Sequence, residues 1–340
     1  MPFRRRNPLR GRSLGNWFMP KREKEPLRIG GQAVIEGVMI RSPHSMAIAV
    51  RKPNGEIVVK KEGLKFFSEK NFFFKFPVVR GILALISALS LGIRALHFSA
   101  NQALPEEENK KEISSWAMSL TFGLALLFGI FLFFLVPLFL TRGLKWAFPI
   151  LSTSGLLFNL MDGLLRLMIF LAYIKTISFF KEIERVFQYH GAEHKSIFAF
   201  EAGEALKVDR VKTFGYLHPR CGTNFLLIVM VVSLLIFALI PHHLPFGYKV
   251  ASRVVFIPFI AGLSYEIIRF ADRKQDKRGI WFLLQPGLWL QRLTAREPTE
   301  PQIEVALVAL EEVLEMEKQS SQEPLFIRGV NQDPMGNLEQ

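Results

Sequence analysis

The sequence contains a single cysteine and a long stretch without any charged residue. One cysteine cannot form a disulfide bond within the chain, which excludes a disulfide-stabilised fold and fits a reduced cytoplasmic thiol or a metal ligand. Residues 119–140 carry no charge at all, and about 20 such residues are enough to cross the hydrocarbon of a bilayer. These two absences point to a membrane protein rather than to a secreted globular domain.

Apolar residues are gathered into blocks, and four of these blocks predict membrane-spanning helices. They are residues 119–140, 156–174, 225–240 and 254–270. The first and third blocks have no charged side chain, whereas the other two include a few charges within an otherwise lipid-compatible sequence.

A fifth block, residues 77–100, is less apolar. Arg80, Arg94 and His97 bracket a stretch rich in alanine and serine, which suits an interfacial or embedded helix. A full span here would invert everything that follows and export the basic segment 272–278, so we do not count it as a span.

Acidic residues are scarce at the start of the chain. The first 80 residues hold 18 Lys and Arg against 6 Glu and no Asp, and the formal net charge of the whole chain is +13. In a membrane protein this asymmetry indicates a cytoplasmic N-terminus and attraction to anionic lipid headgroups, so nucleic acid is not an expected partner. Four spans then place both termini on the cytoplasmic side of the inner membrane.

The loops between the predicted spans agree with this orientation. The two loops placed outside, 141–155 and 241–251, hold only Arg142, Lys145 and Lys249 as cations. The cytoplasmic insert 181–222 holds seven Lys and Arg. Cytoplasmic loops are the ones in which Lys and Arg accumulate.

The parts outside the membrane begin with a basic tail, residues 1–26, that has no apolar periodicity and is predicted to be disordered. Residues 27–66 predict a small β unit. Strands near 46–52 and 56–61 flank a turn at Asn54-Gly55, and the glycine-containing segment 30–40 predicts a third strand.

After the membrane region, residues 117–270 with their insert, residues 271–318 predict cytoplasmic helices and residues 319–340 a tail. Within them an amphipathic soluble helix has Thr299 as a possible cap and Pro301 in its first turn. The predicted fold is therefore a mainly α membrane protein with four spans, one interfacial or embedded helix, a small N-terminal β unit and a soluble C-terminal helix.

The insert contains "YHGAEH", in which His190 and His194 are four residues apart with Glu193 between them. On a helix the two imidazoles share one face at the separation that two ligands of one metal require. The run matches H-x-x-E-H, in which two histidines bind zinc and the glutamate acts as a base. The alternative is that both histidines are hydrogen-bonded polar residues facing inward, or interface residues at the headgroup level.

A second cluster, "LHPRCGTNF", places His218 and Cys221 three residues apart in a turn directly before a membrane block. Histidine and thiolate at this spacing can bind the same metal ion. The alternative is a capped loop with a buried cysteine.

Ionisable residues inside the spans are functional suspects by default. Asp162 and Arg166 are four apart and are expected to pair structurally. Glu266 lies near the predicted depth of the histidines and is a candidate oxygen ligand.

Five motifs in one order carry a family resemblance: "GGQAVIEGVMIRSP", "YHGAEHK", "HPRCGTNF", "GLSYEIIRF" and "LTAREPTEPQIEVALVAL". From Arg28 to Leu314 the chain resembles the YqhQ-like family of bacterial membrane proteins, domain of unknown function 1385. It departs from that pattern at Ala295, where a threonine is expected. The resemblance implies a membrane location and a metal-dependent enzyme, without a reaction or substrate.

Two functions from different classes follow. The first is a membrane-bound metal-dependent hydrolase in which His190, His194 and either His218 or Cys221 hold Zn²⁺ and Glu193 is the general base. The second is a membrane scaffold or assembly factor with a structural metal site, and neither identifies a substrate or protein partner. Transport is less favoured, because the spans carry few polar residues.

Overall fold

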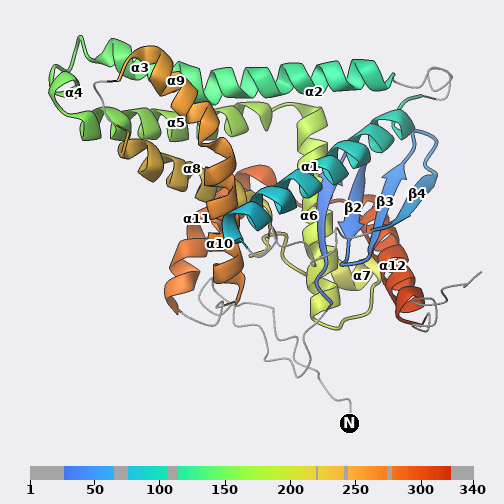
Figure 1. Ribbon diagram of the computed structural model, residues 1–340. Helices are drawn as coiled ribbons and strands as arrows, with labels where there is room; N and C mark the ends of the chain where they lie inside the picture. The colour runs from blue at the N-terminus through green and yellow to red at the C-terminus, as the bar shows by residue number, and fades with distance from the viewer. Residues whose placement is uncertain are drawn as a thin grey trace, which may run out of the picture.

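A computed structural model of the protein describes residues 27–64, 76–105, 114–219, 221–240, 244–273 and 278–322. The predicted tail 1–26 and most of the predicted tail 319–340 lie outside these residues. The described chain is mainly helical with one four-stranded antiparallel sheet (Figure 1). The strands are β1 (Gly30–Val34), β2 (Gly37–Arg41), β3 (Ser45–Arg51) and β4 (Ile57–Gly63).

The helices are α1 (Pro77–Gln102), α2 (Ser115–Ile130), the π-helical turn η2 (Phe131–Leu135), α3 (Val136–Leu144), α4 (Ile150–Thr153), α5 (Gly155–Ile177), α6 (Lys181–Glu201), α7 (Val208–Val211), α8 (Thr223–Ala238), α9 (Phe246–Val255), α10 (Ile257–Arg273), α11 (Arg278–Thr294) and α12 (Glu300–Gln322).

The sheet follows chain order, β1-β2-β3-β4, and each strand pairs with the next one. The hairpin predicted around Asn54-Gly55 is present as β3–β4, with Gly55 at a φ of 91°. The single strand predicted over 30–40 was wrong, because this segment folds back on itself as β1–β2. The turn residue Glu36 has a φ of 51°. Glycine and asparagine adopt such a positive φ readily, so the glutamate at this position gives no sign of the turn.

The two faces of the sheet pack against different helices, since successive side chains of a strand point to opposite sides. Val38, Ile40, Ala47 and Ala49 form one core with α6 and α12. Met39, Met46, Ile48 and Val50 form another with Leu91 and Ala95 of α1. The sheet thus lies between α1 and the α6–α12 pair, as Figure 1 also shows.

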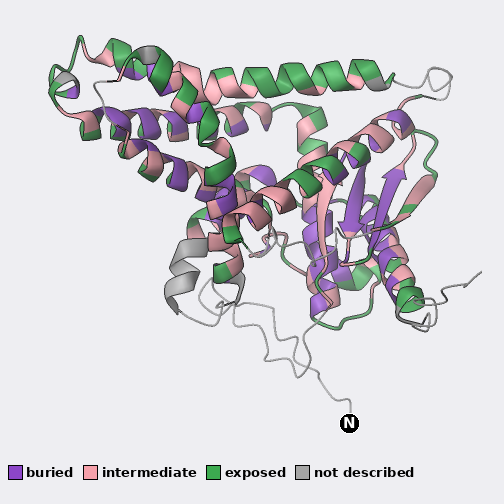
Figure 2. Ribbon diagram, in the orientation of Figure 1, coloured by how far each residue is buried: buried purple, intermediate pink, exposed green. Residues whose placement is uncertain are grey.

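Within the described residues, three helical segments are long and apolar enough to cross a membrane: Pro77–Gln102, Trp116–Leu144 and Gly155–Ile177. The pair α9–α10 would make a fourth span, but it is bent by 40° between Val255 and Ile257, so the single helix predicted over 254–270 is broken at its start. The predicted span 225–240 corresponds to α8, which has only 16 residues. Figure 2 shows α2 exposed over most of its length, as expected for a helix that faces lipid.

The helix α1 meets the length and composition of a span, although it was predicted to be interfacial or embedded. Its first half crosses α10 so closely that a Cβ on Gly81 would lie 2.6 Å from the carbonyl oxygen of Gly262. Its second half packs on the sheet through Leu91 and Ala95. The two halves of α1 therefore join the apolar helices to the β unit.

Candidate metal centre

The helix α6 carries the paired histidines and follows α5 after three residues. His194, Ile197 and Glu201 are buried along one stripe, as the helical spacing predicts, and His190 is nearly so. The ring centroids of His190 and His194 are 4.3 Å apart.

Both histidines have one ring nitrogen fixed by a main-chain carbonyl. His190 Nδ1 lies 2.8 Å from the Thr294 oxygen, and His194 Nδ1 lies 2.6 Å from the Tyr216 oxygen. A carbonyl only accepts hydrogen bonds, so each Nδ1 carries the hydrogen and each Nε2 of a neutral ring presents its lone pair. This arrangement is typical of histidines that bind a metal through Nε2.

Cys221 completes a group of three. His190 Nε2 is 3.1 Å from Cys221 Sγ, and the ligand atoms of His190, His194 and Cys221 all lie within 4.8 Å of one another. We call this group the His–His–Cys cluster. His194 Nε2 is buried and has no hydrogen-bond partner among the described residues. Because burying such an atom without a partner costs free energy, it indicates that a ligand belongs there.

The Cys221 sulfur accepts two further contacts, from the Thr223 hydroxyl at 3.2 Å and the Thr223 N–H at 3.4 Å. The cysteine also lies directly before α8, whose N-terminus carries partial positive charge. Thr223 and the start of α8 thus surround the sulfur with hydrogen-bond donors, an environment that suits a metal-bound cysteine.

Glu193 lies beside the cluster. Its Oε2 is 3.7 Å from His194 Nε2 and 4.0 Å from His190 Nε2, and its side chain is buried. Burial raises the pKa of the Glu193 carboxyl, while His190, His218 and a hydrogen bond from the Gly31 N–H oppose that shift. Gly31 belongs to β1, and a Cβ there would lie 2.9 Å from Glu193 Cγ, so the β unit approaches the site through a glycine.

His218 is not part of the cluster. Its Nε2 is 3.5 Å from Glu201 Oε2, and its ring centroid is 5.7 Å from that of His194. Burial lowers the pKa of His218, and the interaction with Glu201 offsets only part of this. The structure thus groups Cys221, rather than His218, with the paired histidines.

Glu266 does not join the cluster either. Arg80 binds it with two hydrogen bonds, Nε to Oε1 at 3.1 Å and a second nitrogen to Oε2 at 2.7 Å. A carboxylate paired in this bidentate manner serves the α1–α10 contact. The other intramembrane expectation is met, because Asp162 and Arg166 form a buried ion pair with an N–O distance of 2.7 Å.

Several residues that build the site were not singled out in the sequence. Gln291 holds the cysteine loop: its side chain accepts from the His218 N–H and donates to the His218 carbonyl, both at 2.8 Å. Gly191 lets α6 approach the segment after α11, since a Cβ there would lie 2.0 Å from the Arg296 oxygen. The glycine directly after His190 was the one available signal.

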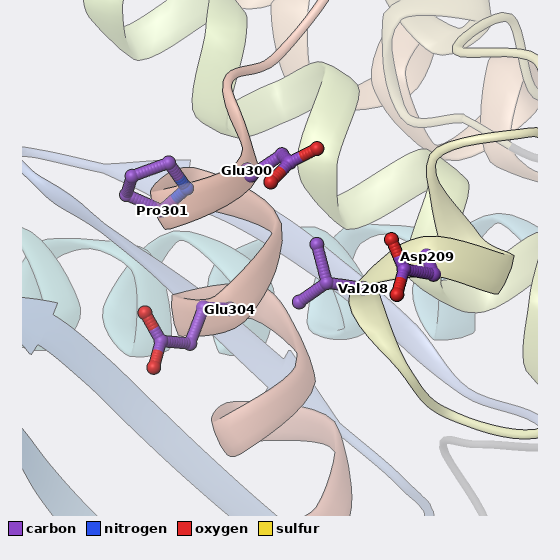
Figure 3. Close-up of a pocket in the computed structure, with 5 residues that line it drawn as sticks. All are labelled: Val208, Asp209, Glu300, Pro301 and Glu304. Atoms are coloured by element: carbon purple, nitrogen blue, oxygen red, sulfur yellow. The ribbon is translucent and has the colours of Figure 1, made fainter.

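A surface hollow away from the His–His–Cys cluster also contains acidic side chains, but these are paired with cations. Val208, Asp209, Glu300, Pro301 and Glu304 line it, between α7 and the start of α12 (Figure 3). Lys212 pairs with Asp209 and Glu300, and Arg51 pairs with Glu304. Each of these carboxylates is paired with lysine or arginine, and none of the residues lining the hollow belongs to the His–His–Cys cluster.

Comparison with known proteins identifies the family of the chain. A family model described as "Protein of unknown function (DUF1385)" matches residues 76–316. The chain belongs to the DUF1385 family. A protein of Bacillus subtilis (strain 168) named "Uncharacterized protein YqhQ" is 36% identical over 328 residues, which are 93% of this chain and 99% of that protein. No solved structure matches. The DUF1385 match includes His190, His194 and Cys221, and its description assigns no reaction.

Proposed function

We propose that this DUF1385 protein is a metal-dependent hydrolase of the cytoplasmic membrane, with its site at the cytoplasmic interface. One observation carries the proposal: two histidine Nε2 atoms, each freed by a carbonyl bound to Nδ1, converge with a cysteine sulfur. Two nitrogens and one sulfur are a ligand set that suits Zn²⁺.

The number of ligands favours an enzyme. Catalytic zinc sites use three protein ligands and leave the fourth position open, whereas structural sites use four. His190, His194 and Cys221 are three. A zinc ion held by them would act as a Lewis acid and activate a water molecule at the open position.

Glu193 supplies the proton acceptor in this scheme. Its carboxylate faces both Nε2 atoms from outside the three-ligand group, close enough to accept a proton from the attacking water. The Gly31 N–H holds the carboxylate in place. The same Glu193 can later return the proton to the leaving group.

A scaffold with a structural metal is the second candidate, and the position of Glu193 is what favours it. A small rotation of the carboxylate would make it a fourth ligand, because Oε2 is already within 4.0 Å of both nitrogens. The site would then be closed, and a metal would only tie α6 to the start of α8.

The orientation of the protein rests on its charges. Lys and Arg accumulate before α1 and in the segment from α6 to α8, which favours a cytoplasmic location for both termini and for the His–His–Cys cluster. Anionic headgroups are the partners that these basic segments would contact.

Glu193→Gln separates the two candidates. For a hydrolase, the purified variant keeps about one zinc ion per chain and fails to complement a deletion strain, because the amide cannot accept a proton. Loss of zinc in this variant would make Glu193 a ligand, and full complementation with zinc retained would favour the scaffold. Glu182→Gln, an exposed change on the same helix, is the matched control and should behave as the parent.

The metal itself is tested by His194→Ala and Cys221→Ser. Each should lose the ion, with an affinity loss larger than the roughly 10- to 100-fold that removal of an outer-shell partner costs. His44→Ala removes an exposed imidazole far from the cluster in sequence and should keep the metal. Equal zinc content in all three variants contradicts the proposal.

A further inference from the structure

A second cluster of charges lies at the other end of α5 and α8. The helix α8 starts two residues after Cys221 and ends at Ala238, and just beyond it Asn159 of α5 donates a 2.9 Å hydrogen bond to the Ile240 carbonyl. Around this end are five cations, which we call the basic cluster: Arg142, Lys145, Arg166, Lys249 and Arg253.

The inner part of the basic cluster shares one carboxylate. Asp162 Oδ2 accepts hydrogen bonds from Arg166 at 2.7 Å and from Arg253 at 2.8 Å, and all three side chains are at most 2% exposed. Both guanidinium groups also lie against the ring of Phe237. Two buried cations on one anion leave a net positive charge inside the apolar bundle, which is costly unless compensated.

The outer part adds two ammonium groups. Lys145 Nζ and Lys249 Nζ each lie 4.8 Å from the centroid of the Phe158 ring, so both occupy one small region. Lys145, Arg142 and Arg253 act on Lys249 as like charges, and Asp162 acts on it as an opposite charge. An anion placed among these ammonium groups would relieve their mutual repulsion.

The surroundings indicate that this end lies at the headgroup level. Trp146, Phe148 and Tyr248 are all exposed beside the two lysines in sequence. Exposed Trp and Tyr are typical of the interface between hydrocarbon and water. Moreover, Arg142, Lys145 and Lys249 are the only cations of the two loops between spans expected on the outer side, and all three belong to the basic cluster.

We propose that the basic cluster binds the phosphate of an anionic phospholipid, with Lys145 and Lys249 in direct contact with it. Arg253 and Arg166 lie deeper and supply long-range attraction, while Asp162 holds them in place. The site is separate from the His–His–Cys cluster, at the opposite ends of α5 and α8.

The test compares the parent with Lys145→Gln, Lys249→Gln and the double variant as full-length protein in neutral detergent. Phosphatidylglycerol, phosphatidylcholine or inorganic phosphate is titrated while the melting temperature is measured, since a ligand that binds the folded state raises it. Each substitution should weaken the apparent affinity for phosphatidylglycerol about fivefold, because a lysine near an anionic headgroup contributes about 1 kcal/mol. Lys175→Gln, an exposed change at the other end of α5, should have no effect.

The proposal is supported if phosphatidylglycerol stabilises the parent more than phosphatidylcholine does, and if this stabilisation is weakened in each single variant and lost in the double variant. Stabilisation by inorganic phosphate alone overturns the lipid as source. If phosphatidylglycerol raises the melting temperature of the parent and of the double variant equally, the site is wrong. The site is also wrong if the double variant melts at a lower temperature than the parent and is still stabilised by phosphatidylglycerol. Phospholipid extracted from the purified parent and double variant provides a second measurement and should be richer in anionic lipid for the parent.

Discussion

Gly191 controls how closely the histidine helix approaches its neighbour. The Arg296 N–H donates to the Phe187 carbonyl at 2.9 Å, and the Arg296 oxygen lies where a side chain on Gly191 would be. Two residues earlier, Thr294 provides the carbonyl that fixes His190. Gly191 therefore helps to determine which ring nitrogen of His190 carries the hydrogen, although glycine has no side chain that could contact the imidazole.

We expect Gly191→Ala to lower the metal content although every ligand remains. The new methyl group would push residues 294–296 away, which costs about 1–3 kcal/mol of the free energy of unfolding and breaks the bond from His190 Nδ1 to Thr294. Metal analysis and chemical denaturation of the purified variant measure both effects. Gly123→Ala, where a Cβ meets nothing within 4 Å, should stay within about 0.5 kcal/mol and keep its metal. A Gly191→Ala protein with full metal content would show that the carbonyl bond is dispensable.

At the level of single residues, sequence was enough to pair His190 with His194, because helical periodicity fixes residues four apart on one face. It could not choose between His218 and Cys221. That choice depends on Glu201, which lies beside His218, and on Gln291, which holds the loop from α11. Both contacts join residues distant in the chain. The pairing of Glu266 with Arg80 was hidden for the same reason, since the two residues are 186 apart in the chain.

Among the elements, α12 and the loop between β2 and β3 are joined by a buried carboxylate. Glu317 accepts hydrogen bonds from the Ser42 hydroxyl and from the His44 N–H at 2.8 Å. Burial raises the pKa of Glu317, but these hydrogen bonds outweigh it and lower the pKa below its usual value. The ionised form is therefore the one that the folded state prefers.

This gives a pH dependence with a defined sign. A carboxyl whose pKa is lower in the folded state stabilises the protein above its unfolded pKa, about 4.3, and loses that contribution as pH falls through the folded value. Glu317→Gln should thus be less stable than the parent at pH 6, and the difference should shrink as pH falls below about 4. Thermal melts of both proteins from pH 6 to pH 3 measure it. A difference that grows with acid would contradict the assigned shift.

Among the elements, the sequence predicts the β3–β4 hairpin but not the β1–β2 hairpin or the break before α10. Asn54-Gly55 announced the β3–β4 hairpin because asparagine and glycine tolerate positive φ. The β1–β2 hairpin gave no such signal. Its turn residue Glu36 is instead held by Arg185 and Tyr189 of α6, contacts that exist only in the folded chain. The break before α10 was likewise hidden within an apolar run.

For the whole molecule, the position of α1 decides how many times the chain crosses the membrane. Its second half covers one face of the sheet, and Arg94 pairs with Glu62 of β4. A helix half committed to the β unit cannot be surrounded by lipid over its full length. We therefore retain the prediction that α1 does not cross.

Cysteine labelling tests this crossing. Probes introduced at Gly63, at the end of β4, and at Pro105, after α1, should report the same side of the membrane in intact cells. The unsubstituted chain controls for labelling of Cys221, and a probe at Gly143, exposed at the end of α3, should report the opposite side. If the probes at Gly63 and Pro105 report opposite sides of the membrane, α1 is a span, and one end of the chain has the opposite orientation from the one predicted.

The shortness of α8 has a consequence for the bilayer around the protein. Its 16 residues extend about 24 Å, against a hydrocarbon thickness of about 30 Å. If α8 crosses the membrane, such hydrophobic mismatch is accommodated by thinning of the adjacent lipid, by flanking side chains that reach toward the interface, or by oligomerisation. Cys221 precedes the first residue of α8 by two positions, so thinning of the lipid at this end would occur beside the proposed zinc ligand. The thickness of the surrounding membrane would thereby act on the end of α8 next to the proposed zinc ligand.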